Sequence, residues 1–437
     1  MVQIAFLTLF LGLISGKQEV AVAVHGPVSA VELLLDGTAV ARLGGPPWST
    51  RVDLGPDLEP HELMARALDA EGQEIGRTQQ LLNLPRPPAE VSILLEGGSK
   101  GRPAGARLTW NNPSFAKPTA VSLLLDGNPL PLDGQAHSVL PVVDPGVTHV
   151  LSAEVRFSPS LVARRAVGFG VGWGDEISTA LTAVPVRLRP GRKMPDAVGL
   201  QGWILAAGKA VPVAAVDRGP AQLLVVRDEK VRRPLQLYGQ LRGDLGGDRM
   251  DPRVRLEMIL KQNGEIKIIW PYAHAVAGAG VTADRFNSTE SFTATDGGLL
   301  WLLGLLVPQS REAEQHLSDA VAVAGLEALG GHGPRAVLLV VGDNPQDLSV
   351  YSPGSVAHYL ESIHVPFIVW SQRGTKTPAS TAWGRAEDVS SKPKLLGAFS
   401  RLEDNLDTQR IVWIEGSHLP GAISLSPAAE AVLELVR

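Results

Sequence analysis

The sequence contains no cysteine, and this absence excludes several kinds of chemistry together. Without cysteine there are no disulfides, no thiolate nucleophile and no zinc site with sulfur ligands. Charged residues are also scarce, at 19% of 437 residues, and the formal net charge is -5. Because no basic excess is present to neutralise phosphates, we expect no nucleic-acid partner. No apolar run reaches the roughly 20 residues needed to cross a bilayer, so we expect no membrane span.

An apolar run near the N-terminus has two interpretations. Residues 4–14 (IAFLTLFLGLI) have the length of a signal-peptide core. However, no Lys or Arg precedes the run, and Ser15, Gly16 and Lys17 make a poor cleavage site. The alternative, which we prefer, is a β-strand over residues 4–11, since a similar strand opens the repeat described next. On that interpretation a cytoplasmic location is preferred to a secreted one, although the sequence does not fix the compartment.

The first half of the chain contains an internal repeat of about 90 residues. Residues 31–37 (VELLLDG) recur almost unchanged as residues 121–127 (VSLLLDG). Residues 60–67 are echoed by residues 148–155, and residues 91–96 (VSILLE) take the place of the N-terminal run. Alternating strands at this spacing predict two tandem immunoglobulin-like β-sandwiches.

Within each repeat, one aspartate and one histidine recur. Asp36 and Asp126 each precede a glycine, and Asp-Gly is typical of turns that need a positive φ. Calcium binding is the alternative, but one aspartate per turn falls far short of the six to eight oxygens of a calcium site. His61 and His149 are interpreted as strand residues at a sandwich edge. A proline cluster at residues 85–88 marks the end of the first repeat.

From about residue 199 the pattern changes to alternating strands and helices. Continuous apolar runs such as residues 222–226 (QLLVV) and 336–341 (AVLLVV) are typical of buried parallel strands. We predict further strands at 265–270, 291–293, 365–370 and 410–414, and helices at 234–260, 313–329, 355–363 and 394–406. This alternation predicts a doubly wound, Rossmann-like α/β domain. The expected domains are residues 1–86 and 87–190 as sandwiches and 196–437 as the α/β domain.

The segment from 317 to 371 resembles the core of a von Willebrand factor type A domain, of the kind found in acidobacterial proteins. An amphipathic helix leads into an apolar strand and the turn Gly342-Asp343-Asn344, followed by the loop Asp347-Leu348-Ser349, a helix and another strand. The resemblance is sharp over these 55 or so residues and extends over the last 220 or so in element order. It implies a recognition domain whose ligands bind at the carboxyl ends of the strands.

The metal-ion-dependent adhesion site of that family is degenerate in this sequence. The family's Asp-x-Ser-x-Ser motif corresponds to residues 228–232, where Asp228 remains but Lys230 and Arg232 replace the serines. Thr295 and Asp343 match the family's other two ligands. A lysine ammonium would repel a divalent ion, by about 8 kcal/mol at 4 Å and an effective dielectric near 20. We therefore expect no cofactor and no tightly bound metal, with weak Mg²⁺ binding by the three vestigial residues as the alternative.

These features predict a non-catalytic protein that binds an unidentified protein partner, in scaffolding or adhesion. The polar residues at the carboxyl ends of the strands are either vestiges or a metal-independent binding patch. The candidate contact residues are Asp228, Lys230, Arg232, Thr295, Asp296, Asp343, Asn344, Asp347 and Ser349. Two other functions remain open: a hydrolase or transferase that uses the 343–349 loop, and an adhesion module with weak metal dependence. No His-Glu-x-x-His motif or phosphate loop supports an enzyme. The sequence leaves the oligomeric state open.

Overall fold

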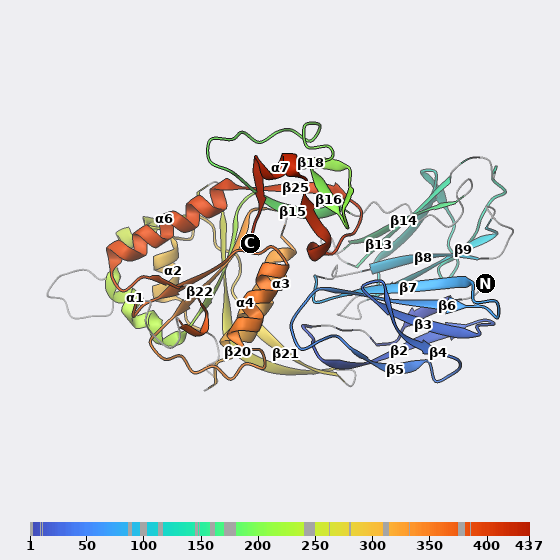
Figure 1. The fold of residues 1–437 in the computed structure, drawn as a ribbon, viewed down its shortest axis with the longest axis horizontal. Coiled ribbons are helices and arrows are strands. Elements are labelled where there is room, and N and C mark those ends of the chain that lie inside the picture. The colour runs from blue at the N-terminus through green and yellow to red at the C-terminus, as the bar shows by residue number, and fades with distance from the viewer. Residues whose placement is uncertain are drawn as a thin grey trace.

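The computed structural model describes residues 3–437 apart from 9, 11, 86–89, 97–102, 112–116, 145–146, 148, 158–161, 170–180, 240–249, 262, 279–280, 309–313, 332, 375–380 and 385. The described strands form seven sheets. Figure 1 shows two β-sandwiches beside each other at one end of an elongated molecule, an α/β unit at the other end, and antiparallel strands between them. The predicted proline-rich linker at 85–88 lies largely outside the described residues.

The first sandwich contains two antiparallel sheets that enclose a common core. One sheet has the order β1-β2-β5 and the other β4-β3-β6-β7. Inward-facing Val20, Val31 and Leu63 from the two sheets are almost fully buried. The strands are β1 (Gln3–Phe6), β2 (Lys17–His25), β3 (Ala30–Leu35), β4 (Thr38–Leu43), β5 (Ser49–Asp53), β6 (His61–Leu68) and β7 (Glu74–Leu82). The strand predicted over residues 4–11 is therefore confirmed for residues 4–6 of β1, which pairs with β2, whereas residues 7, 8 and 10 are not part of a strand.

The second sandwich repeats this arrangement, as the sequence repeat predicts. Its sheets have the orders β12-β9-β8 and β11-β10-β13-β14. The strands are β8 (Glu90–Glu96), β9 (Gly105–Asn111), β10 (Ala120–Leu125), β11 (Asn128–Leu130), β12 (His137–Val139), β13 (His149–Arg156) and β14 (Val162–Phe169). The β10–β13 pair occupies the place of the β3–β6 pair in the first sandwich. Asp36 and Asp126 have φ of 51° and 49°, which confirms the predicted turns.

A six-stranded sheet forms the centre of the α/β unit. Its order is β21-β20-β19-β22-β23-β24, and every strand is parallel to its neighbours except the edge strand β21. The bounds are β19 (Gln222–Arg227), β20 (Glu265–Gly278), β21 (Val281–Ser288), β22 (Arg335–Val341), β23 (Phe367–Ser371) and β24 (Ala386–Asp388). All seven residues of β22 are buried, which explains why this strand reads as a continuous apolar run.

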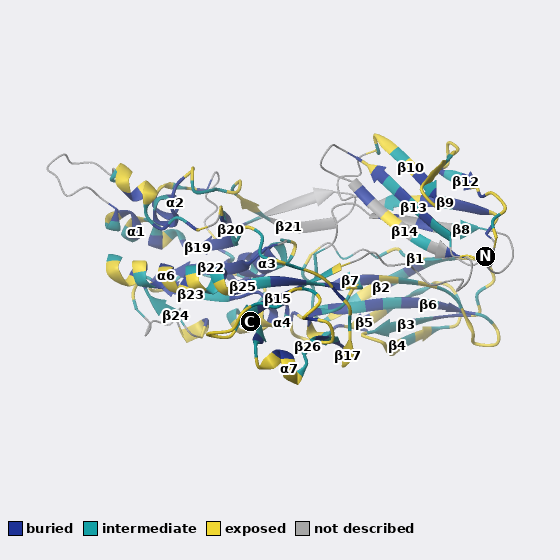
Figure 2. Ribbon diagram, turned by 90° about the horizontal axis from the view of Figure 1, so that it is seen from above, coloured by how far each residue is buried: buried dark blue, intermediate teal, exposed yellow. Residues whose placement is uncertain are grey.

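Helices cover both faces of this sheet. One face packs against α1 (Arg232–Tyr238), α2 (Leu299–Leu305) and α6 (Lys392–Thr408), and the other against α3 (Leu317–Leu329) and α4 (Pro353–Ser362). Figure 2 shows the buried strands between these helical layers. The helix predicted over 234–260 is much shorter: α1 ends at Tyr238, and the 3-10 helices η1 (Glu229–Val231) and η2 (Pro252–Leu256) lie on either side. The strand predicted at 291–293 is a single bridge between Ile266 and Phe292.

A separate antiparallel layer lies between the sandwiches and the α/β unit. Its main sheet has the order β18-β25-β15-β27, and a smaller sheet has the order β17-β16-β26. The elements are β15 (Leu181–Leu188), β16 (Ile204–Ala206), β17 (Lys209–Ala210), β18 (Val213–Asp217), β25 (Gln409–Glu415), η3 (Pro420–Ala422), β26 (Ile423–Leu425), α7 (Pro427–Glu430) and β27 (Leu433–Leu435).

This layer corrects one sequence prediction. Residues 410–414 were expected to form the last strand of the parallel sheet, but β25 pairs antiparallel with β15 and β18 instead. Both kinds of sheet bury strands on two faces, so an apolar run does not distinguish them. β15 lies within the range 87–190 expected for the second repeat, yet its hydrogen-bonded neighbours are β25 and β27.

The first sandwich also packs directly against the α3–α4 face of the α/β unit. Leu58 of the sandwich is completely buried in the core beneath these helices. The Tyr359 hydroxyl donates to the Asn83 carbonyl at 2.8 Å, and the Tyr351 hydroxyl donates to the Leu13 carbonyl at 2.9 Å. The sandwich therefore covers part of the α/β unit.

Candidate functional site

Asp228 is the first of the candidate residues at the carboxyl end of the parallel sheet, and it is completely buried. It directly follows β19. One carboxylate oxygen accepts hydrogen bonds from the Lys230 amide at 3.1 Å and from the Gln315 side chain at 3.4 Å. The other accepts from the Gly342 amide at 3.1 Å. A Cβ at position 342 would lie 3.0 Å from that oxygen, so a larger residue would require the carboxylate to shift by a few tenths of an ångström. Asp228 thus joins the loops after β19 and β22.

Lys230 makes a second connection between the same two loops. Its ammonium donates to the Asn344 carbonyl at 2.9 Å. Arg232 extends toward Glu229, with 4.0 Å between the Arg232 Nη1 and Glu229 Oε1 atoms. Asp343 and Asn344 are both exposed. Lys230 and Arg232 therefore both lie in this loop region, and Lys230 binds a backbone oxygen there.

Thr295 and Asp296 lie in a turn away from Asp228. The Thr293 amide donates to the Asp296 carboxylate at 2.8 Å, and the Thr295 hydroxyl lies 2.8 Å from that of Thr293. The hydrogen bonds that Asp296 accepts from the Thr293 amide and the Thr293 hydroxyl lower its pKa. Arg255 fixes the turn by donating to the Thr295 and Asp296 carbonyls.

The helix α2 separates this turn from the carboxyl end of β19. The turn precedes α2, whereas Leu303 near the end of α2 is the residue that contacts Arg227 beside Asp228. Seven helical residues span about 10 Å. The structure therefore brings Asp228 and Asp343 to neighbouring loops but does not bring Thr295 to them.

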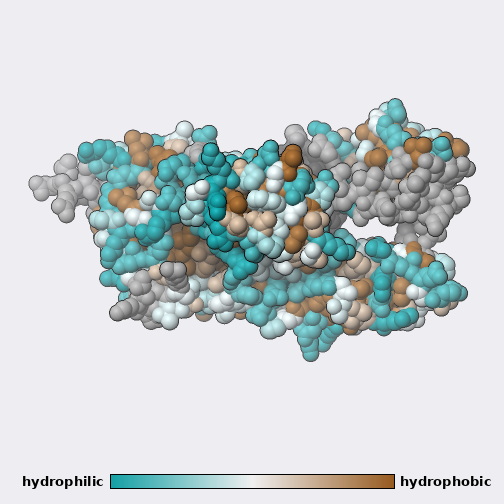
Figure 3. All heavy atoms as spheres, turned by 45° about the horizontal axis from the view of Figure 1, so that its top comes forward, coloured by the Kyte–Doolittle hydropathy of each residue, from teal (hydrophilic) through white to brown (hydrophobic). Residues whose placement is uncertain are grey.

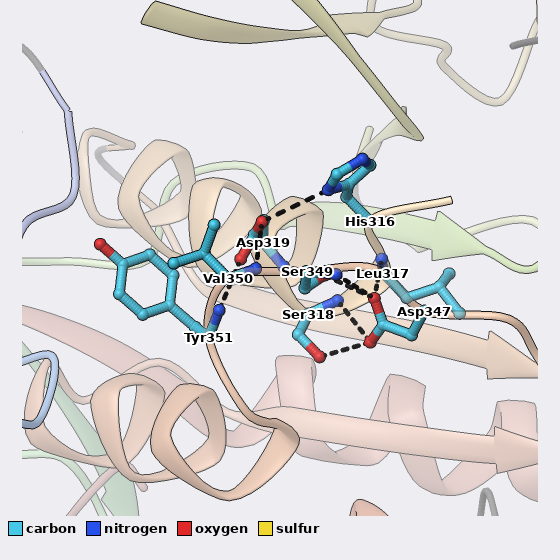
Figure 4. Close-up of polar contacts among 8 residues, drawn as sticks. All are labelled: His316, Leu317, Ser318, Asp319, Asp347, Ser349, Val350 and Tyr351. Carbon is cyan, nitrogen blue, oxygen red and sulfur yellow. Dashed lines mark hydrogen bonds and ion pairs between the residues drawn. The ribbon is translucent and has the colours of Figure 1, made fainter. Parts of the chain in front are cut away.

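Asp347 and Ser349 form a cap at the N-terminus of α3 (Figure 4). One Asp347 oxygen accepts from the Leu317 amide at 2.9 Å, and the other accepts from the Ser318 hydroxyl at 2.6 Å. The Ser349 hydroxyl donates to Asp347 at 2.5 Å and accepts from the Asp319 amide at 3.1 Å. The first amides of a helix have no partner within the helix, and a carboxylate there also interacts favourably with the helix dipole. Both residues therefore have a structural role.

Asp319 holds the other side of the same loop. Its carboxylate accepts from the Val350 and Tyr351 amides at 3.0 and 3.1 Å, and the His316 ring lies 3.7 Å away (Figure 4). The loop and the helix terminus thus exchange hydrogen bonds in both directions. Leu348 and Val350 remain exposed on this fixed backbone, at 53% and 81%.

Arg227 was not predicted from the sequence as a residue of this region, although its guanidinium makes several interactions here. It is fully buried at the end of β19, and burial lowers its pKa. Its guanidinium donates to the carbonyls of Leu303 and Leu306, pairs with Glu229 at 2.8 Å and lies 5.1 Å from the Trp270 ring centroid. A cation at a helix C-terminus is favourable, so Arg227 caps α2. The feature of the sequence that could have pointed to Arg227 is its position directly before Asp228, at the end of an apolar strand.

The repeated aspartates and histidines also form pairs that were not predicted from the sequence. In the first sandwich the His61 Nδ1 atom lies 2.7 Å from Asp36, and in the second the His149 Nδ1 atom lies 2.7 Å from Asp126. Each aspartate also accepts from the backbone amide after the histidine. The histidines therefore stabilise the β-turns of the neighbouring hairpins. Their recurrence at matching repeat positions was the signal for this pairing.

Within the described part of the chain, no group of three or more His, Asp or Glu side chains is placed to hold a metal ion. Among the described helices, none is both long and apolar enough to cross a membrane. Figure 3 shows apolar residues in several separate groups among polar ones on the face it presents.

No protein-family model matches this chain, and no curated protein matches it. Similar solved structures include the central fibronectin-III array of RIM-binding protein, at 10% identity, TM-score 0.21, 45% of this chain and 81% of that one. The ArnB paralog VWA2 from Sulfolobus acidocaldarius has 10% identity and TM-score 0.21, over 69% of this chain and 67% of that one. The fibronectin(III)-like modules of Clostridium thermocellum CbhA have 12% identity and TM-score 0.17, over 18% of this chain and 93% of that one. With TM-scores this low, none of these similarities assigns the chain to a family.

Proposed function

We propose that this chain is a non-catalytic binding protein that contacts a protein partner through the loop of residues 343–351. The α/β unit acts as a recognition domain resembling a von Willebrand factor type A domain without a working metal site. The strand order of its sheet supports this, because ligands of doubly wound sheets bind at the carboxyl ends of the strands. The sandwiches serve as spacers and as support for the α3–α4 face.

The observation that carries this proposal is the combination of exposed aliphatic side chains with a fixed backbone. Leu348 and Val350 are exposed, yet the Leu348 amide donates to the Gln315 carbonyl at 2.8 Å and the Val350 amide donates to Asp319 at 3.0 Å. A loop held in one conformation loses little entropy when it binds. Apolar side chains on such a loop supply contact area without reorganisation.

The hydrolase or transferase alternative receives less support from the same contacts. The Ser349 hydroxyl is engaged by Asp347 and by the Asp319 amide, and its described partners include no histidine. The sequence at 97–101 fits the pattern Gly-x-Ser-x-Gly, but it lies between the paired antiparallel strands β8 and β9. A nucleophile elbow requires a strand followed by a helix. We therefore infer binding rather than catalysis.

Affinity capture with the full chain tests the proposal. The bait variant carries Leu348→Asp and Val350→Asp, and the matched control carries Leu256→Asp and Val198→Asp, two aliphatic residues that are 75% and 79% exposed elsewhere. We expect the wild type and the control to enrich the same partner and the loop variant to lose it. Equal enrichment by the loop variant would refute the proposed surface.

The same capture in the presence of a chelator tests the metal-dependent alternative. The proposal predicts unchanged enrichment, because Lys230 and Asp228 already connect the two loops by hydrogen bonds. Loss of the partner in chelator, restored by Mg²⁺, would favour an adhesion module with weak metal dependence.

A further inference from the structure

The first sandwich docks onto the α/β unit through the segment between β5 and β6, residues 54–60. This segment starts at buried Leu54 and is followed by His61, which pairs with Asp36. Between these two anchors, Leu58 is completely buried in the core beneath α3 and α4. An aliphatic side chain of this segment therefore packs against a pair of helices.

The corresponding segment of the second sandwich lies between β12 and β13 and has the same two anchors. It starts at buried Leu140 and is followed by His149, which pairs with Asp126. Here, however, aliphatic side chains are left in solvent. Val142 is 94% exposed, and Val139 at the end of β12 is 73% exposed. We define the loop surface by its four exposed residues, Val139, Pro141, Val142 and Asp144.

A pair of helices with exposed aliphatic side chains lies on the face of the α/β unit that the first sandwich does not cover. Gly304 of α2 lies close to α1, because a Cβ at this position would be 3.5 Å from the Gln236 Cα atom. The residues that follow these two, Leu305 and Leu237, are 36% and 55% exposed. We define the helical surface by its four exposed residues, Arg233, Leu237, Leu305 and Val307.

The loop surface and the helical surface lie far apart in one molecule and carry opposite charges. Figure 2 shows α1 and α2 at one end of the long axis and β12 at the other, so a contact between the two surfaces requires two molecules. Asp144 is exposed two residues after Val142. Arg233 is exposed one helical turn before Leu237, on the same side of α1. Each surface thus combines aliphatic side chains with one charge, and the two charges are complementary.

We propose that the loop surface docks onto the helical surface of a second copy of this chain, with Asp144 next to Arg233. The contact repeats between molecules what the first sandwich does within the chain, where Leu58 packs against α3 and α4. Because the contact joins two unlike surfaces, it is heterologous and adds further copies end to end. Both surfaces are small, so we expect weak association that depends on concentration.

Sedimentation equilibrium of the full chain over a range of concentrations tests this contact. We expect the average mass of the wild type to rise with concentration above the mass of one chain. The control variant carries Val40→Asp and Val198→Asp, which change two exposed valines elsewhere, and should associate as the wild type does. A wild type that stays monomeric at every concentration would overturn the proposal.

Two variants that each lack one surface show whether the contact joins unlike surfaces. Val139→Asp with Val142→Asp disrupts the loop surface, and Leu237→Asp with Val307→Asp disrupts the helical surface. All four positions are exposed, so we expect both variants to fold. Each should be monomeric alone, whereas their equimolar mixture should contain complexes of two chains, because it retains one intact surface of each kind. Wild-type association by either variant, or a mixture no heavier than its components, would overturn the proposal.

Exchange of the two charges tests the orientation of the contact. Asp144→Arg and Arg233→Asp should each weaken association about 2- to 5-fold, as expected for an exposed ion pair. A chain that carries both changes should associate as the wild type does. The His149 ring lies 3.0 Å from the Asp144 carbonyl, but an effect of Asp144→Arg on this segment alone would not be reversed by Arg233→Asp. Failure of the double variant to restore association would overturn the proposed docking.

Discussion

Asp228 and Asp343 are both aspartates that follow parallel strands, but their surroundings differ. Asp228 is buried and accepts hydrogen bonds from two backbone amides and a side chain, whereas Asp343 is exposed. The sequence placed both at the carboxyl end of the sheet, because each follows a recognisable apolar strand. It did not show which one is buried, since burial depends on the loop from the neighbouring strand.

The first prediction concerns this difference. Asp228→Ala leaves the Lys230 amide and the buried Gly342 amide without their acceptor, so we expect a loss of about 2–3 kcal/mol in the free energy of unfolding. Asp343→Ala should change it by less than about 0.5 kcal/mol, as exposed positions usually do. Urea unfolding of both variants measures this. Equal losses, or a rise in wild-type stability on adding Mg²⁺ that both variants abolish, would support a metal site.

The second prediction is a pH dependence that arises from the Asp126–His149 pair. Hydrogen bonding to Asp126 raises the His149 pKa above its ordinary 6.5, and hydrogen bonding to His149 lowers the Asp126 pKa below its ordinary 3.8. The contribution of His149 to the free energy of unfolding is complete below pH 6.5 and is lost as the pH rises through the pKa of His149 in the folded protein. The contribution of Asp126 is complete above pH 3.8 and is lost as the pH falls through the pKa of Asp126 in the folded protein.

The pair therefore stabilises the second sandwich most between about pH 4 and 6.5. Because the Asp126 side chain is 43% exposed, we expect the pair to add less than about 1 kcal/mol to the free energy of unfolding. Urea unfolding of wild type and His149→Gln at pH 5.5 and pH 9 measures it. The difference between the two proteins should shrink at pH 9, and a difference that grows with pH would contradict this assignment.

The helix α3 depends on a cap from a distant part of the chain. Asp347 lies 30 residues beyond Leu317, whose amide it accepts, and Ser349 supports it. The sequence predicted the helix from its apolar face and its terminal glycines. It did not predict the cap, because the loop of residues 343–351 is distant from the start of α3 in sequence. The pairing of β22 within the sheet brings the two together.

Removal of this cap gives the third prediction. Asp347→Ala should lower the free energy of unfolding by about 1–2 kcal/mol, the usual effect of losing a helix cap. Its neighbour Gln346 is exposed, so Gln346→Ala serves as the control and should have little effect. Hydrogen exchange should also be faster at Val350 and Tyr351 in the Asp347 variant. Unchanged stability and exchange would mean that the loop is not held as the structure shows.

Other elements show what local sequence can and cannot decide. The repeated β3–β4 and β10–β11 hairpins were predictable, because Asp-Gly fixes the turn and alternation fixes the strands. The placement of β25 was not, since its partner β15 lies more than 200 residues earlier in the chain. The turn of Thr295 matched a motif by residue type, but α2 lies between it and the other candidates.

The whole molecule is held together by contacts between segments far apart in sequence. The Tyr359 hydroxyl reaches the Asn83 carbonyl across 276 residues, and Tyr351 reaches Leu13 across 338. His358 lies 3.2 Å from Glu59 in the same interface. A fragment that begins at residue 199 would lack the first sandwich and β15, and would expose the α3–α4 face and one edge of β25. This interface could not be predicted from the sequence, because each of its residues also fits the pattern of its own strand, helix or loop.

The fourth prediction tests that interface. Tyr359→Phe leaves the buried Asn83 carbonyl without its donor, and we expect a loss of about 1–3 kcal/mol in the free energy of unfolding. Tyr351→Phe is the matched change at a less buried hydroxyl and should have a smaller effect. Limited proteolysis should release the first sandwich more readily from the Tyr359 variant. Identical unfolding and cleavage for wild type and both variants would contradict the packing described.

The most direct test of the proposed function is site-specific photocrosslinking in cells that produce the full chain. A photoreactive residue at position 348 lies on the proposed contact loop, and the same residue at position 198 is a control at a more exposed site, since Leu348 is 53% exposed and Val198 is 79% exposed. We expect one discrete adduct with a partner protein from position 348 and none from position 198. No adduct from position 348, or the same adduct from both positions, would refute the proposed contact loop.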